Sequence, residues 1–111
     1  MQTLLWIYAG GGLFLALLAL PLLAEKVKPN PFYGFRVSET LTNPSLWYPT
    51  NKYFAKRLLV VGLVEALAAI GLYFWPGISL DAYAWGCLAV FLGLFIPAII
   101  QSWRYLKKLR P

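Results

Sequence analysis

The chain has 111 residues, of which 60% are hydrophobic and 13% charged, and its formal net charge is +6. A mean hydropathy of +0.65 lies outside the range of ordinary soluble domains. The length allows one domain at most, and three long apolar runs leave too little polar surface for a soluble helical bundle. We therefore predict a single all-α transmembrane domain over residues 1–111, built as a three-span helical bundle.

The basic residues are distributed unevenly between the two sides of these runs. The N-terminus and the short turn at 76–81 contain neither Lys nor Arg. By the positive-inside rule this predicts an N-out/C-in topology. We therefore expect the net positive charge to interact with the lipid bilayer rather than with nucleic acid. The basic residues between the first two runs and after the third are Lys26, Lys28, Arg36, Lys52, Lys56, Arg57, Arg104, Lys107, Lys108 and Arg110.

The first predicted span covers residues 3–24, with Trp6 and Tyr8 near the outer interface. The small residues in it, Gly10, Gly11, Gly12, Ala16 and Ala19, allow a neighbouring helix to approach closely. Pro21 is expected to end or kink the helix near the inner leaflet. Because the start Met1-Gln2-Thr3 lacks a basic segment, we expect a retained helix rather than a cleaved signal peptide.

A cytoplasmic loop is predicted over residues 25–57, and it is rich in aromatic side chains. Asn43 followed by Pro44 predicts a helix start, and apolar residues follow at helical spacing. We predict an interfacial helix, broken at Pro49, that leads into the second span. Lys52 and its basic neighbours would meet anionic lipid headgroups.

The second predicted span, residues 58–75, contains Glu65 near its middle. A carboxyl group at membrane depth is costly and marks a candidate functional site. Glu65 shares one helix face with Gly62, Ala66, Ala69 and Tyr73, so it should face protein rather than lipid. Glu65 and Tyr73 are the predicted intramembrane polar site. Two alternatives stay open for Glu65: it locks helix packing through a hydrogen bond, or it binds a ligand or an ion.

The third predicted span covers residues 80–102, after a tight turn at Pro76-Gly77. It carries a small-residue stripe, which favours either a compact bundle or a homo-oligomer. The stripe consists of Ala82, Gly86, Ala89 and Gly93.

Catalytic patterns are missing from the sequence. There is no histidine, no nucleophile–base pair, no metal-ligand cluster and no phosphate-binding glycine loop, and the single cysteine, Cys87, rules out an intrachain disulfide. We therefore expect no enzyme activity, no metal and no cofactor.

The loop carries a family resemblance. Residues 31–36 (PFYGFR), 40–44 (TLTNP), 46–48 (LWY) and 51–52 (NK) resemble the loop signature of the SdpI-type immunity protein family of bacteria. The resemblance implies a multi-pass protein of the bacterial cytoplasmic (inner) membrane that protects the cell from a membrane-active peptide toxin. It also implies a role in holding a transcriptional regulator at the membrane. The signature residues assigned to partner binding are Asn30, Gly34, Arg36, Thr40, Trp47, Asn51 and Lys52.

Other interpretations stay open beside immunity. The protein could be a small transporter or ion-conducting oligomer that uses Glu65, or a structural subunit of a larger complex. Arg36 could cap carbonyl groups of the loop, or pair with Glu39 or with a partner. For Trp47 we expect an anchor at the membrane interface rather than a ligand contact.

Overall fold

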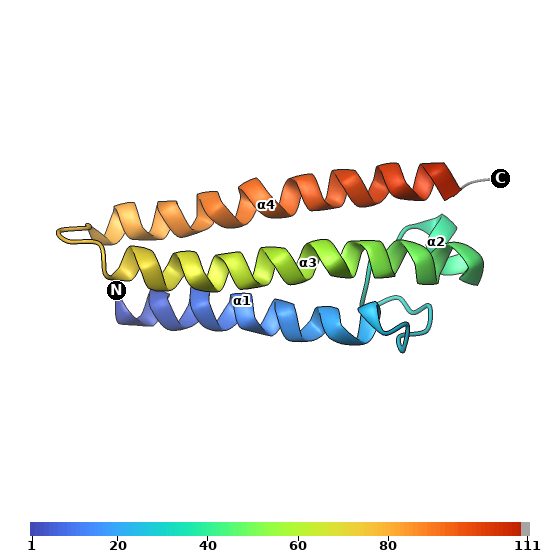
Figure 1. Ribbon diagram of the computed structural model, residues 1–111, viewed down its shortest axis with the longest axis horizontal. Coiled ribbons are helices and arrows are strands. Elements are labelled where there is room, and N and C mark those ends of the chain that lie inside the picture. Colours follow the sequence, from blue (N-terminus) through green and yellow to red (C-terminus); the bar gives the residue numbers. More distant parts are fainter. Residues whose placement is uncertain (110–111) are drawn as a thin grey trace.

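The computed structural model describes residues 1–109, which form four helices: α1 (Gln2–Leu23), α2 (Ser38–Thr42), α3 (Pro44–Tyr73) and α4 (Leu80–Leu109). α1, α3 and α4 run side by side with α3 in the middle, and the molecule is 54 Å long (Figure 1). The described residues contain no strand, so the all-α prediction is confirmed. Arg110, counted above in the basic tail, lies outside the described residues.

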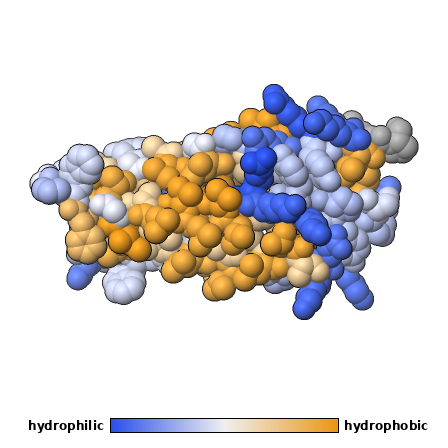
Figure 2. Space-filling model, in the orientation of Figure 1, coloured by the Kyte–Doolittle hydropathy of each residue, from blue (hydrophilic) through white to orange (hydrophobic). Residues whose placement is uncertain are grey.

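Two of the helices, Gln2–Leu23 and Leu80–Leu109, are long and apolar enough to cross a membrane. α3 is not one of them, so two of the three predicted spans are supported. Its apolar part, from Leu58 to Tyr73, is shorter than either of these helices and contains Glu65. The hydrophobic surface lies over the middle of the molecule, and strongly hydrophilic side chains gather mainly at the end that holds α2 (Figure 2).

α3 is one continuous helix, and this corrects the predicted interfacial helix with its break at Pro49. Its 30 residues include Pro49, and its first turns continue the axis of the rest (Figure 1). A proline inside a helix removes one hydrogen bond and costs about 3 kcal/mol. On either side of Pro49, the buried side chains of Trp47 and Asn51 form hydrogen bonds with the loop backbone, and these contacts help to offset this cost. The predicted start is confirmed, because Asn43 accepts a hydrogen bond from the Ser45 amide.

α1 and α3 approach each other closely through the small residues predicted to share their faces. Gly12, Ala16 and Ala19 of α1 are buried against α3. A Cβ atom added at Gly12 would lie 2.5 Å from the carbonyl oxygen of Gly62 and 2.9 Å from the amide nitrogen of Ala66. The two backbones are therefore in contact, and neither glycine can carry a side chain.

α4 packs on the other side of α3, and of its predicted stripe only Gly86 takes part in this contact. Ala82, Ala89 and Gly93 are exposed, whereas Gly86 is half-buried and faces Leu72 of α3. The stripe as a whole therefore does not form the contact with α3, and the homo-oligomer alternative stays a prediction. The residues that α4 buries are Tyr83, Cys87, Ala98, Ser102 and Leu106. The Tyr83 hydroxyl donates a hydrogen bond of 2.8 Å to the carbonyl oxygen of Ala69. Tyr83 therefore contributes both packing and a hydrogen bond to this contact, because its ring is buried and its hydroxyl finds a backbone acceptor.

The glycine contact yields a first prediction. Gly62→Leu should lower the stability of the purified protein by about 1–3 kcal/mol or more, because a side chain there must separate α1 from α3. Thermal unfolding in detergent would measure the loss. Gly71→Leu is the matched control on the same helix, since a Cβ atom at Gly71 meets nothing within 4 Å. Equal losses in both variants would contradict a close α1–α3 contact.

Candidate functional site

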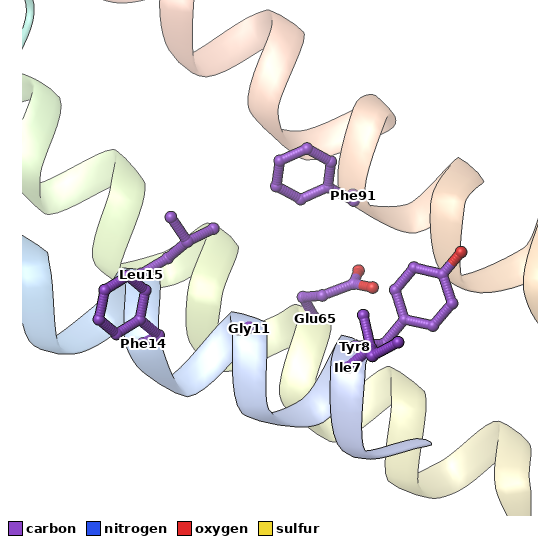
Figure 3. Close-up of a pocket in the computed structure, with 8 residues that line it drawn as sticks. Ile7, Tyr8, Gly11, Phe14, Leu15, Glu65 and Phe91 are labelled. Atoms are coloured by element: carbon purple, nitrogen blue, oxygen red, sulfur yellow. The ribbon is translucent and has the colours of Figure 1, made fainter. Parts of the chain in front are cut away.

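A groove lies between α1 and α4, and α3 forms its floor. Its volume is about 330 Å³. Most of its lining is apolar, and the side chains of Ile7 and Phe14 at its edge are each 59% exposed. The groove therefore opens sideways, toward the surface that α1 presents. The residues that line it are Ile7, Tyr8, Gly11, Gly12, Phe14, Leu15, Glu65 and Phe91 (Figure 3).

Glu65 is the only charged side chain in this lining. The residue is 2% exposed, and its carboxyl group lies between the rings of Tyr8 and Phe91 (Figure 3). Neither carboxyl oxygen has a hydrogen-bond partner among the described residues. The prediction that Glu65 faces protein is confirmed, but the packing lock through a hydrogen bond is not found. A buried polar group without a partner costs about 1–3 kcal/mol, and more if it is charged.

The α1 sequence explains why the groove exists. Gly12 brings α1 against α3, while Gly11 lies on the groove side, where a Cβ atom would meet nothing within 4 Å. One turn earlier, the Tyr8 hydroxyl donates a hydrogen bond of 3.2 Å to the carbonyl oxygen of Ala84 in α4. Gly11 thus leaves empty space beside the close contact made by Gly12, and Tyr8 bridges α1 and α4 next to this space.

Tyr73, predicted to share the polar site with Glu65, is not in the groove lining. It is eight residues further along α3, which corresponds to about 12 Å along the helix axis. There its ring packs edge-on against Phe74 and Tyr83. Tyr8 takes the place beside Glu65 instead. The sequence suggested only an interfacial aromatic at Tyr8, because its distance from Glu65 depends on how α1 packs.

The loop signature residues form a second cluster, which fastens the loop to the first turns of α3. Asn51 lies at its centre: its side-chain oxygen accepts a 2.6 Å hydrogen bond from the Phe35 amide, and its side-chain nitrogen donates to the Trp47 carbonyl at 3.1 Å. The Trp47 indole donates to the carbonyl oxygen of Val27 at 2.7 Å. Trp47 is fully buried in the chain, so it is not the interface anchor that the sequence suggested.

Further hydrogen bonds shape the loop itself. The Thr40 hydroxyl lies 3.0 Å from the Phe35 carbonyl and accepts from the Val37 amide at 3.0 Å. The Asn30 side chain accepts from the amides of Phe32 and Tyr33 at 3.0 and 2.8 Å. Arg36 donates to the carbonyl oxygen of Pro31, the capping interaction considered above.

Gly34 is required where the loop meets α3. Its φ of +114° is a conformation that other residues rarely adopt. A Cβ atom there would also lie 2.7 Å from the side-chain oxygen of Asn51 and 3.1 Å from the Trp47 ring. Both the backbone conformation and the space therefore restrict this position to glycine.

The cluster separates the signature residues into two groups. Thr40, Trp47 and Asn51 are buried and use their polar atoms within the chain. Arg36 and Lys52 remain exposed. Phe32, which we did not assign to the site, is 87% exposed on the same loop. A partner at this end would meet the exposed side chains, which the buried group holds in place.

The cluster yields a second prediction. Asn51→Leu should destabilise the loop by about 1–3 kcal/mol, because it leaves the buried Phe35 amide without an acceptor. Hydrogen exchange of the segment 30–40 should become faster, measured by mass spectrometry. Lys52→Leu, at the exposed neighbouring position, should leave the exchange unchanged. Exchange that is as slow in Asn51→Leu as in the wild type would show that another interaction holds the loop.

Comparison with known proteins agrees with the loop signature. The model of the SdpI/YfhL protein family matches residues 26–102. The match covers the loop, α2, α3 and most of α4, and it begins just after α1. No curated protein sequence and no solved structure matched the chain. With more than half of its length matched, this chain belongs to the SdpI/YfhL protein family.

Proposed function

We propose that this protein is an immunity-type protein of the bacterial cytoplasmic membrane, without enzyme activity, that binds a membrane-active peptide in the groove over Glu65. In this proposal α1, α3 and α4 all span the bilayer, with the N-terminus outside and the loop inside. Family membership is consistent with an immunity-type membrane protein. The observation that carries the proposal is the buried carboxyl group of Glu65, without a hydrogen-bond partner, on the floor of a groove that opens sideways.

The chemistry of the groove suggests the kind of peptide. Its walls are apolar side chains such as Ile7 and Phe14, which suit a peptide that is itself dissolved in the bilayer. Glu65 would accept hydrogen bonds from a Lys, an Arg or a peptide terminus. In a dry site such a charge-assisted bond is about twice as strong as a neutral one. Binding would thereby supply the partner that Glu65 lacks within the chain.

The exposed side chains at the loop end suggest a binding site for the second role that we propose, which is to hold a transcriptional regulator at the membrane. A transcriptional regulator held at the membrane would contact the exposed Phe32, Arg36 and Lys52 at the loop end. Glu65 lies about 20 Å along α3 from Lys52. The groove and the loop end are therefore separate sites. Toxin binding and regulator binding would therefore be separable by mutation.

The transporter alternative makes different demands on the same residue. An ion pathway needs several polar groups along its length, whereas Glu65 is the only charged residue among the described residues that line the groove. An oligomer could still bring several copies of Glu65 together, so resting membrane potential is a necessary readout in the test below.

Glu65→Gln provides the third prediction. In a sensitive bacterium challenged with synthetic membrane-depolarising peptides, the wild type should preserve the membrane potential. Glu65→Gln should reduce protection about tenfold or more against peptides with Lys or Arg, because a charge-assisted bond is lost. Its thermal stability in detergent should stay equal or rise, since the change removes a costly buried acid. Asp81→Asn, at an exposed acid at the start of α4, should behave as the wild type.

Each alternative has its own outcome in this experiment. A stability loss in Glu65→Gln would indicate a packing role. A wild type that shifts the resting potential without any peptide, while Glu65→Gln does not, would favour ion conduction. Absence of protection by the wild type against every peptide, at confirmed membrane levels, would refute the immunity proposal.

A pair of adjacent glycines provides the fourth prediction. Gly11→Leu should fill the groove and abolish protection without loss of stability, because a Cβ atom at Gly11 meets nothing within 4 Å. Gly10→Leu is the matched control: it has the same free space but does not line the groove. Cell survival at equal expression would measure both. Full protection by Gly11→Leu would place peptide binding elsewhere.

A further inference from the structure

We propose that the face between α3 and α4 at the basic end of the molecule binds one anionic phospholipid, with its phosphate at Arg104 and Lys108. Two adjoining hollows form this face. One, of about 240 Å³, is lined by Tyr53, Gln101, Arg104, Tyr105 and Lys108. The proposal concerns a surface away from the Glu65 groove and does not depend on the immunity function.

Helix periodicity brings the polar groups of this hollow together. Gln101, Arg104, Tyr105 and Lys108 follow one another at offsets of three, four and seven on α4, so they share one helix face. The hollow contains two cationic side chains, and no Asp or Glu is among the residues that line it in the described part of the chain. The positive charge of this hollow is complementary to the negative charge of a phosphate group.

Two stacked tyrosine rings line the same hollow as the cations. The rings of Tyr53 and Tyr105 stack with their centroids 4.4 Å apart and an angle of 7° between them. Arg57 lies over the Tyr53 ring at 5.2 Å and donates a 3.2 Å hydrogen bond to its hydroxyl. The Tyr53 hydroxyl keeps its own proton, which it could donate to a headgroup oxygen.

The second hollow explains why the ligand is a lipid rather than free phosphate. It has a volume of about 200 Å³ and shares Gln101 with the first. Its apolar lining includes Val60, Leu94 and Pro97, with Gly93 leaving room between them. A basic end joined to an apolar groove matches a phosphate headgroup joined to an acyl chain. Arg57, which also lines this second hollow, adds a third cation near the junction.

The charge of the site selects among phospholipids. A zwitterionic lipid carries its own ammonium group, which the three cations would repel, since no Asp or Glu is among the described residues that line either hollow. An anionic lipid such as phosphatidylglycerol has no such group and gains attraction from each cation. We therefore assign the site to anionic phospholipids.

Native mass spectrometry of the full chain in detergent tests this assignment. With added dioleoyl phosphatidylglycerol we expect one tightly bound lipid, and about tenfold weaker binding in the double variant Arg104→Gln/Lys108→Gln. The control Lys28→Gln/Lys107→Gln removes the same charge from exposed positions outside both hollows. It should retain binding.

Further measurements distinguish binding of an anionic phospholipid at this site from binding of free phosphate and from binding elsewhere on the protein. Glycerol 3-phosphate should not compete, and dioleoyl phosphatidylethanolamine should bind more weakly. Gly93→Leu should fill the apolar hollow and weaken lipid binding, whereas Gly71→Leu should not, although both positions have free space. Equal weakening by both charge variants, equal binding of both lipids, or competition by glycerol 3-phosphate would each overturn the proposal.

Discussion

The contact between the backbones of α1 and α3 is the constraint on which the rest of this structure depends. Gly12 and Gly62 face each other so closely that neither tolerates a Cβ atom. In a bilayer the hydrophobic effect does not drive helices together, so close backbone packing has to supply the association energy. The contact fixes the depth of α1 relative to α3 and thereby determines which α1 residues lie beside Glu65.

The groove is a direct consequence of this packing. Gly12 faces α3, and Gly11, about 100° around the helix, leaves space on the side of α4. Tyr8 reaches across to Ala84, and Tyr83 reaches Ala69, so hydroxyl-to-carbonyl hydrogen bonds join α4 to both other helices. Among the described residues the buried side-chain oxygens of Thr50 and Glu65 have no hydrogen-bond partner, and of these two residues only Glu65 lines the groove. The hydroxyls of Tyr8 and Tyr83 are satisfied while the carboxyl group in the groove is not, and this contrast makes Glu65 the centre of the proposed function.

At the loop end, by contrast, the buried polar side chains form hydrogen bonds that stabilise the fold of the loop. Asn51 satisfies backbone groups of Phe35 and Trp47, and Gly34 gives it the space to do so. The buried residues of the family signature therefore have a structural role, because they fasten the loop to α3. The surface at this end carries the exposed side chains of Phe32, Arg36 and Lys52. Binding at this end would depend on these exposed groups.

By itself the sequence determined the helical class, the two apolar spans at residues 3–24 and 80–102, the start of α3 at Asn43 and the burial of Glu65. Each of these follows from local composition or from the period of one helix. Tertiary structure decided that α3 continues through Pro49, that the buried face of α4 contains Tyr83 rather than most of the predicted stripe, and that Tyr8 rather than Tyr73 lies beside Glu65. These outcomes depend on contacts between segments far apart in the chain, whose packing can outweigh the local preference of a proline or a glycine stripe.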